Sequence, residues 1–396
     1  MVNKKNVELG EVRSVIRELF EYGKMQKEIV GEDNVFDFSI GNPSVPAPSI
    51  VRDTLIDLLT NEDPVKVHGY TSAQGDLGVR TSISEYLNKT YSASTDPNLI
   101  YLTVGAAAAL TSAINAICNP GDEVVLIAPF FPEYRVFIEK AQAKVVVTKS
   151  NKNTLKPDYN ELEKAITKNT KAVIIDYPNN PTGVVLNEAE LAEFAAFLHK
   201  KEIEYGHEIY LISDEPYREL IFEDIKYPFV TNFYNNSIIC YSFSKSLSLP
   251  GERIGYVLVN PKCNEANTVY SAVCGAARSL GFVCAPTIFQ YLIPKALGHT
   301  GDLSIYKDNR DYLYKSLTEI GYEVVKPSGA FYMFVKSPSG DGKEFSDRAK
   351  KYNVLIVPSD SFGIDGYVRI SYCVDNKMIR RSISSFKNIM EEYKNG

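Results

Sequence analysis

The sequence predicts an α/β fold built on a mostly parallel sheet of seven strands, with helices covering both faces of the sheet. Seven short apolar runs rich in β-branched residues alternate with longer segments of helical periodicity. The runs are almost continuously apolar, which is typical of strands buried on both faces of a parallel sheet. In chain order they cover residues 100–104, 123–127, 143–147, 171–175, 208–212, 237–241 and 253–259.

The two ends of the chain predict a second, smaller unit. An amphipathic helix is expected over residues 12–27, before a short apolar segment at residues 36–43. The C-terminal part of the chain mixes helical and strand patterns. We therefore expect a large domain over residues 47–292 and a smaller α+β domain formed by residues 1–46 and 293–396.

Composition and charge narrow the class of protein. Of the 396 residues, 44% are hydrophobic and 23% are charged, as in ordinary globular enzymes. The net charge of −6 argues against a nucleic-acid-binding protein, which would normally be basic. No apolar stretch reaches the roughly 18 residues of a membrane span, and the N-terminus lacks the apolar core of a signal peptide. We expect a cytoplasmic protein that binds neither nucleic acid nor membrane.

Metal and disulfide chemistry are not expected from the sequence. The six cysteines are scattered without a C-x-x-C pair, and the four histidines form no H-E-x-x-H motif. In a chain of this length such cysteines are expected to be reduced and mostly buried.

Polar residues gather where the predicted strands end. Four clusters cover residues 103–107, 176–183, 213–218 and 242–253. Ligands of open α/β sheets bind beyond the carboxyl ends of the strands. We therefore expect the four clusters to converge on one pocket.

The segment SFSKSLSLPGERIGY at residues 242–256 has three interpretations. Ser242 and Lys245 match the S-x-x-K pattern of serine acyl-enzymes, but the S-D-N and K-T-G motifs of those enzymes are missing. Alternatively, Lys245 and Arg253 are solvated residues of a surface loop. In the third interpretation Lys245 is buried, so that its pKa falls and its neutral amine can form a Schiff base. Ser242 and Arg253 would then bind a nearby phosphate.

Four other positions bear on this choice, each with a structural alternative. Gly105 precedes an apolar helix whose free N–H groups can bind an anion, or it only permits tight packing. Asp214 closes an apolar strand, where a carboxylate needs a partner such as a protonated ring nitrogen. Asn180 lies in the N-N-P-T-G loop, for which an ordinary turn is the structural alternative. Phe131 offers a flat ring on which a heterocycle can stack, and its structural alternative is a core residue. Together with Lys245, at successive strand ends, they predict a pyridoxal phosphate site.

Beyond these positions, the sequence resembles the class I and II aminotransferases, the pyridoxal phosphate-dependent enzymes of fold type I that include aspartate aminotransferases. The resemblance extends from about residue 36 to residue 384, with the motifs in the family's order. The motifs are Ile40-Gly41-Asn42-Pro43, Tyr70 with Gly75, Gly105-Ala106-Ala107, Asn179-Asn180-Pro181-Thr182-Gly183, Ser213-Asp214-Glu215-Pro216-Tyr217, Ser242-x-Ser244-Lys245 with Gly251-x-Arg253-x-Gly255-Tyr256, Pro327-x-Gly329-Ala330-Phe331-Tyr332, and Val368-Arg369-Ile370-Ser371.

The resemblance implies a role for each of these residues toward the cofactor. Lys245 would hold pyridoxal phosphate as a Schiff base and then act as the general base. Asp214 would keep the ring nitrogen protonated, and Phe131 would stack on the ring. Asn180 and Tyr217 would bind the phenolic oxygen. The phosphate would be bound by Gly105, Ala106, Ala107, Ser242, Ser244 and Arg253.

The resemblance also implies residues for the substrate and for a partner subunit. Arg369 would bind the substrate α-carboxylate as a bidentate pair, with Gly41 and Asn180 nearby. Arg278 is a candidate for a distal carboxylate, and a surface arginine is the structural alternative. Tyr70 would reach the phosphate bound by the neighbouring subunit, which implies a homodimer with shared active sites.

We therefore expect an aminotransferase that moves the amino group of an L-amino acid to a 2-oxo acid such as 2-oxoglutarate, by a ping-pong mechanism. An aspartate-like amino donor is favoured. One alternative is a lyase on the same scaffold that cleaves a C–S bond or eliminates a β or γ group. Another is a regulatory domain that senses the cofactor without turnover, although no helix-turn-helix precedes the enzyme-like region.

Overall fold

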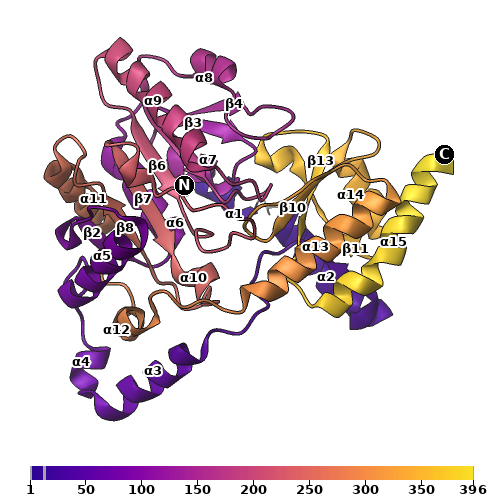
Figure 1. The fold of residues 1–396 in the computed structure, drawn as a ribbon, viewed down its shortest axis with the longest axis horizontal. Coiled ribbons are helices and arrows are strands. Elements are labelled where there is room, and N and C mark those ends of the chain that lie inside the picture. Colours follow the sequence, from indigo (N-terminus) through magenta and orange to yellow (C-terminus); the bar gives the residue numbers. More distant parts are fainter. Residues whose placement is uncertain (1, 12–14, 396) are drawn as a thin grey trace.

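The computed structural model describes residues 2–11 and 15–395, and its largest sheet has seven strands in the order β2-β8-β7-β6-β5-β3-β4 (Figure 1). The strands are β2 (Ile100–Thr103), β3 (Glu123–Ala128), β4 (Lys144–Lys149), β5 (Thr170–Asp176), β6 (Tyr210–Asp214), β7 (Ser237–Ser242) and β8 (Gly255–Val259). Only β8 is antiparallel to its neighbours β2 and β7 in this sheet. The predicted α/β fold with a mostly parallel sheet of seven strands is confirmed.

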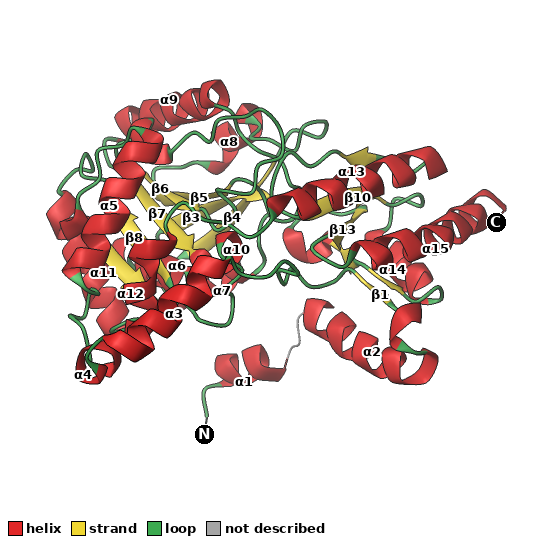
Figure 2. Ribbon diagram, turned by 60° about the horizontal axis from the view of Figure 1, so that its bottom comes forward, coloured by secondary structure: helices red, strands yellow, loops and turns green. Residues whose placement is uncertain are grey.

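Helices cover both faces of this sheet (Figure 2). On one face lie α5 (Leu77–Tyr91), α9 (Glu188–Tyr205) and α12 (Thr287–Ala296), and on the other α6 (Ala106–Ile117), α7 (Glu133–Lys140) and α11 (Ala266–Leu280). Consecutive strand residues pack on opposite faces: Val125 joins the first cluster and Val124 the second. This double burial explains why six of the strands are continuously apolar in sequence, whereas the edge strand β4 is only partly buried.

The remaining helices of this part of the chain are α3 (Ser49–Asn61), α4 (Pro64–His68), α8 (Tyr159–Ala165) and α10 (Phe243–Ser246). Helix α10 follows β7 directly and carries Lys245. Its first N–H groups are capped by Ser242, whose hydroxyl accepts from the backbone N–H of Ser244 at 3.2 Å. The lysine is therefore held in one turn of helix at the carboxyl end of a buried strand.

A second unit combines both ends of the chain. Its four-stranded antiparallel sheet has the order β12-β13-β10-β9. The strands are β9 (Val324–Val325), β10 (Tyr332–Lys336), β12 (Val357–Pro358) and β13 (Tyr367–Ser371), and α13 (Leu303–Ile320), α14 (Gly342–Lys350) and α15 (Asn376–Asn395) pack with them. A separate parallel pair joins β1 (Phe36–Asp37) to β11 (Val354–Leu355). Because N-terminal and C-terminal segments share one core, we propose domain limits near residues 47 and 293.

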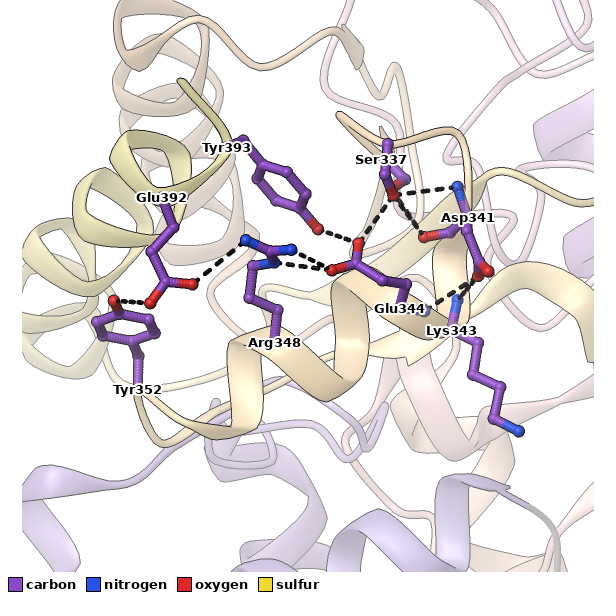
Figure 3. Close-up of polar contacts among 9 residues, drawn as sticks. Ser337, Asp341, Lys343, Glu344, Arg348, Tyr352, Glu392 and Tyr393 are labelled. Atoms are coloured by element: carbon purple, nitrogen blue, oxygen red, sulfur yellow. Dashed lines mark hydrogen bonds and ion pairs between the residues drawn. The ribbon is translucent and has the colours of Figure 1, made fainter. Parts of the chain in front are cut away.

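Polar contacts fasten α14 to α15 (Figure 3). Arg348 donates to Glu344 at 2.7 Å and forms an ion pair with Glu392 at 3.4 Å. The hydroxyl of Tyr352 donates to the same Glu392 carboxylate at 2.6 Å. These half-buried contacts orient the C-terminal helix against the second unit, although such ion pairs add little net stability individually.

The predicted N-terminal helix differs from the described one. Residues 12–14 of the predicted range lie outside the described residues. The structure has α1 (Lys4–Glu11) and α2 (Val15–Val30), so the second helix ends later than residue 27. It ends where Gly31 takes a φ of +89°, which a glycine adopts readily. The amphipathic pattern is confirmed in part, because Leu19 packs against Val357 and Phe362.

The predicted strand over residues 253–259 begins two residues later, at Gly255. Arg253 has a φ of +56°, in the left-handed region, and cannot continue a strand. The strand begins with a glycine, and a Cβ at this position would lie 2.2 Å from the carbonyl oxygen of Tyr241, so no larger residue fits there. The turn before β8 thus directs the Arg253 side chain away from the sheet ladder.

Within residues 2–11 and 15–395, no helix combines the length and the apolar character that crossing a membrane requires.

Replacing Leu211 in the middle of β6 by alanine should destabilise the protein by about 2–5 kcal/mol, because the side chain is fully buried. Ile203→Ala is the matched control, since Ile203 lies on α9 with 71% of its surface exposed. Its free energy of unfolding should change by less than about 0.5 kcal/mol. Urea denaturation measures both, and equal effects would contradict the described packing of β6.

Candidate active site

The carboxyl ends of the central strands open onto a cavity of about 480 Å³. Most residues that the sequence predicted as site residues line it: Gly41, Ala106, Ala107, Phe131, Asn180, Asp214, Tyr217, Ser242, Ser244, Lys245, Arg253 and Arg369. They come from the ends of five different strands or from the loops and helices that follow them, and Gly41 and Arg369 belong to the second unit. The predicted convergence of the polar clusters is therefore observed.

Lys245 is not a solvated surface lysine. Its Nζ donates a hydrogen bond to the carbonyl oxygen of Gly41 at 2.7 Å. The pKa of Lys245 is lowered to about 8, chiefly by burial and also by the positive charges of Arg369 and Arg253, against the influence of Cys373. Near neutral pH a larger fraction of this amine is unprotonated than of an ordinary lysine, and the unprotonated form is the one that attacks an aldehyde.

The opposite wall of the cavity is suited to an anion. Gly105 is the N-cap of α6, and no side chain caps the N–H groups of the first turn. The Arg253 guanidinium lies behind this turn, since a Cβ on Gly105 would be 2.7 Å from its Nη2. Ser242 and Ser244 hydroxyls, 2.7 Å apart, complete a group of donors. A helix N-terminus, a guanidinium and two hydroxyls are the donors that bind phosphate in proteins.

Asp214 ends β6 with one carboxylate oxygen satisfied and one not. Tyr134 donates to Oδ2 at 2.7 Å. Oδ1 is buried and has no hydrogen-bond partner among the described residues. Burial raises the pKa of Asp214 to about 7, opposed by the Tyr134 hydrogen bond. The unsatisfied acceptor lines the cavity, and it fits the protonated nitrogen of a pyridine ring.

Arg369 on β13 is a buried cation that lines the same cavity. Its Nη1 donates to the side-chain oxygen of Asn180 at 3.0 Å, and Nη2 donates to the carbonyl oxygen of Ser39 at 2.6 Å. Its Nε is buried without a partner among the described residues. Burial lowers the pKa of Arg369 from its ordinary value, but the group remains a cation at any physiological pH. Such a guanidinium can accept a carboxylate ligand.

Gly41 and Tyr217 fix the geometry around these groups. The hydroxyls of Tyr217 and Tyr332 are hydrogen-bonded at 2.9 Å. A Cβ on Gly41 would lie 1.9 Å from the hydroxyl oxygen of Tyr332, so no larger residue fits there without moving the tyrosine. The absence of a side chain at Gly41 therefore allows the backbone that accepts the Lys245 hydrogen bond to lie close to Tyr332.

Three predicted residues do not line the cavity within this chain. Gly105 lies behind it, against Arg253. Tyr70 is 97% exposed, and Arg278 is exposed near the end of α11. The roles of Tyr70 and Arg278 were predicted with reference to a neighbouring subunit, and they stay predictions.

Sequence reasoning missed several residues at the site. Tyr134 on α7 resembles an ordinary core tyrosine in sequence, and nothing marks it as the partner of Asp214. Asp176 lines the cavity and closes the apolar strand β5, a signal equal to the one that identified Asp214. Ile16 and Phe20 of α2 also line the cavity, and their helix lies far away in the sequence.

One cavity thus holds a buried amine with a lowered pKa, a carboxylate oxygen without a partner among the described residues and the uncapped N-terminus of α6, and this set of groups fits a pyridine aldehyde phosphate. The fold and the cavity define a pyridoxal phosphate-dependent enzyme of fold type I. A family model described as "Aminotransferase class I and II" matches residues 33–386, so the chain belongs to the class I and II aminotransferases. The predicted family, the cofactor and the enzyme class are confirmed.

Individual relatives agree with this assignment. A probable N-acetyl-LL-diaminopimelate aminotransferase of Bacillus subtilis is 31% identical over 91% of this chain and 90% of its own length. An aspartate aminotransferase of Pyrococcus horikoshii is 31% identical over 96% of this chain and 95% of its own. The crystal structure of an aminotransferase from Eubacterium rectale superposes with a TM-score of 0.98, at 51% identity and 99% coverage of both chains.

The lowered pKa of Lys245 predicts unusual reactivity in the cofactor-free protein. Acylation of Lys245 by pulses of acetic anhydride should reach half its maximal rate near pH 8, because only the neutral amine reacts. An ordinary lysine reaches that point near pH 10.4. Mass spectrometry of peptides would measure both in one sample, with exposed lysines as the internal reference. A Lys245 profile that coincides with theirs would contradict the described burial.

Proposed function

We propose that this aminotransferase transfers the amino group of an aspartate-like L-amino acid to a 2-oxo acid such as 2-oxoglutarate, in a ping-pong cycle. The observation that carries the proposal is the buried Lys245 amine, which shares one cavity with the buried Arg369 guanidinium. The aspartate-like preference is supported by relatives from Pyrococcus horikoshii and Thermotoga maritima that are named aspartate aminotransferases. Other relatives are named for aromatic or diaminopimelate substrates, so the donor must be measured.

In this proposal Phe131 would stack on the ring of the cofactor. The free Oδ1 of Asp214 would accept from the ring nitrogen and keep that nitrogen protonated. Asn180 and Tyr217 would bind the phenolic oxygen. When bound, pyridoxal phosphate draws the electrons of a breaking Cα–H bond into its ring.

The phosphate group belongs, in the same proposal, at the N-terminus of α6. The backbone N–H groups of Ala106 and Ala107 donate to it, and Arg253 supplies the countercharge. Ser242 and Ser244 add hydroxyl donors from the start of α10. Gly105 allows the Arg253 guanidinium to approach this turn closely.

Arg369 and Lys245 act on the substrate. The Arg369 guanidinium binds the α-carboxylate, for which its unpartnered Nε is a further donor. The clamp, with Gly41 and Asn180 nearby, orients the Cα–H bond toward Lys245. The Nζ of Lys245 takes the Cα proton as a neutral amine, and the hydrogen bond to the Gly41 carbonyl sets its position.

We further infer that two copies of the chain share their active sites. Tyr70 is almost completely exposed, and α3 and α4 nearby in the sequence expose Ile56, Leu59 and Val65. Exposed apolar residues of this kind favour a protein–protein interface. In this arrangement Tyr70 reaches the partner's phosphate, and Arg278 is the candidate reader of a distal carboxylate.

The direct test is a panel of amino donors with 2-oxoglutarate, comparing aspartate with an aromatic and a small amino acid. We expect the highest kcat/KM for aspartate. Lys245→Ala should lower turnover by roughly 10²-fold to 10⁴-fold or more, because it removes the proton acceptor. After borohydride treatment the native protein should carry the cofactor covalently on Lys245, as mass spectrometry would show.

Lys200→Ala is the matched control for this test, because Lys200 is exposed on α9. Its turnover and its borohydride product should equal those of the native protein. Native protein without an adduct on Lys245, or a Lys245→Ala protein with full turnover, would disprove the proposed mechanism. A preference for aromatic donors would disprove only the aspartate assignment.

Gly105→Ala should weaken pyridoxal phosphate binding by about 10-fold to 100-fold. The added Cβ would lie 2.7 Å from Nη2 of Arg253, so the guanidinium must move and loses its charge-assisted hydrogen bond to the phosphate. Gly121→Ala is the control, because Gly121 also has a positive φ, of +94°, but no atom lies within 4 Å of its added Cβ. It should lose some stability and no cofactor affinity. Fluorescence titration of the cofactor-free proteins measures both, and equal affinities would place the phosphate elsewhere.

A further inference from the structure

A second buried carboxylate, Asp176, stands beside Asp214 and has no role in the mechanism above. The two are register partners at the ends of the parallel strands β5 and β6. Neighbouring strands lie about 4.8 Å apart, and register partners point to the same face, so the two carboxyl groups are adjacent. Both line the cavity, with only 4% and 5% of their surfaces exposed.

The hydrogen bonds of the pair are unequal. Asp214 Oδ2 accepts from the Tyr134 hydroxyl at 2.7 Å, and Asp176 Oδ2 accepts from the backbone N–H of Asn180 at 3.1 Å. The Oδ1 atoms of both are buried without a partner among the described residues. A carboxyl group that accepts through one oxygen and carries a proton on the other satisfies this pattern.

No cation is among the main groups that shift the pKa of either carboxyl group. Four cations line the cavity: Arg17, Lys245, Arg253 and Arg369. The last three donate hydrogen bonds to oxygens of Gly41, Pro250, Asn180 and Ser39. The other titratable groups that interact with the pair are Tyr134, Tyr177, Glu215, Tyr217, Cys240 and Tyr332. These six groups are all neutral or acidic. Adjacent buried carboxylates in such a setting cannot both ionise near neutral pH.

We propose that Asp176 is a positioning residue that carries the one proton of the pair, so that Asp214 is the ionised member which faces the ring nitrogen of the cofactor. This inference rests on the proposed cofactor site. The Tyr134 hydrogen bond and the incoming positive ring nitrogen both favour the ionised form of Asp214. A neutral Asp176 keeps its bond to the Asn180 N–H and adds no second negative charge.

The direction of the pKa shifts agrees with this assignment. Burial and the charge of Asp214 raise the pKa of Asp176 well above its ordinary value, opposed by hydrogen bonds from the Asn180 N–H and the Tyr134 hydroxyl. Burial raises the pKa of Asp214 to about 7, and the Tyr134 hydrogen bond opposes that rise. Both shifts are upward, as expected of two adjacent carboxyl groups that share one proton.

The first test uses the cofactor-free protein and its unfolding equilibrium as a function of pH. Because the folded protein holds a proton on Asp176 that the unfolded chain releases above its ordinary pKa near 4, native stability falls as pH rises toward the folded pKa. Asp176→Asn removes this proton. For each unit of rising pH, the unfolding equilibrium constant of the native protein should therefore increase more than that of the variant, by a factor of up to about ten.

We expect the variant to be more stable than the native protein at mildly alkaline pH, with the difference shrinking toward mildly acidic pH. Asp365→Asn is the matched control, because Asp365 is exposed and its loss should leave the native profile unchanged. A stability difference that is constant with pH would mean a structural role only and would overturn the proposal. Asp176→Ser, which also removes the carboxyl group, replaces the first variant if that does not fold.

The second test titrates the visible absorbance of the bound cofactor. If Asp176 is already neutral, Asp176→Asn leaves the midpoint of this titration unchanged. If Asp176 is ionised, losing its charge lowers the midpoint, and the proposal is wrong. Failure of the native protein to bind pyridoxal phosphate would disprove the proposed function instead, and the pH profile of the cofactor-free protein would still report on the pair.

Discussion

The desolvation of the Lys245 amine is the constraint on which the rest of the structure depends. The pKa of an amine falls toward neutrality where solvent is excluded, and nearby cations lower it further. Burial at the end of β7 provides the first condition, and Arg253 and Arg369 provide the second. A sheet covered by helices on both faces can provide this burial, because the helices shield its strands from solvent and the ligand cavity lies at the carboxyl ends of the strands.

Unsatisfied polar atoms at the cavity follow from the same constraint. Asp214 Oδ1 and Arg369 Nε are buried without partners among the described residues, and each such atom costs about 1–3 kcal/mol of stability. A ligand that pairs with them removes this cost, so its binding stabilises the folded state. The unpaired atoms thus lower the stability of the cofactor-free protein. A ligand that pairs with them binds more favourably, and this binding free energy can serve to orient a substrate.

The sequence was sufficient to predict those features in which a polar residue ends a long apolar segment. Seven strands were predicted from their apolar, β-branched runs, and six of them are buried on both faces, with the edge strand β4 only partly buried. Lys245 and Asp214 were found because a charged residue at the end of a buried strand is costly. Tyr134 could not be found, since a buried tyrosine on a helix has the same pattern whether it fills a core or donates to a carboxylate. Asp176 gave the same signal as Asp214, but nothing in the sequence showed that the two strands are neighbours. The two-residue strands of the second unit are too short to produce any periodicity.

Both structural units contribute to the one cavity, where the hydrogen-bonded hydroxyls of Tyr217 and Tyr332 join them together with two further hydrogen bonds. Lys245 donates to Gly41, and Arg369 donates to Asn180. In each of these bonds one residue follows a strand of the seven-stranded sheet and the other belongs to the second unit. Both bonds involve groups that also act on the substrate. A carboxylate arriving at Arg369 competes for the guanidinium that binds Asn180, and a reacting Lys245 must leave the Gly41 carbonyl. Under the proposed function, occupation of the cavity would therefore change hydrogen bonds that join the two units.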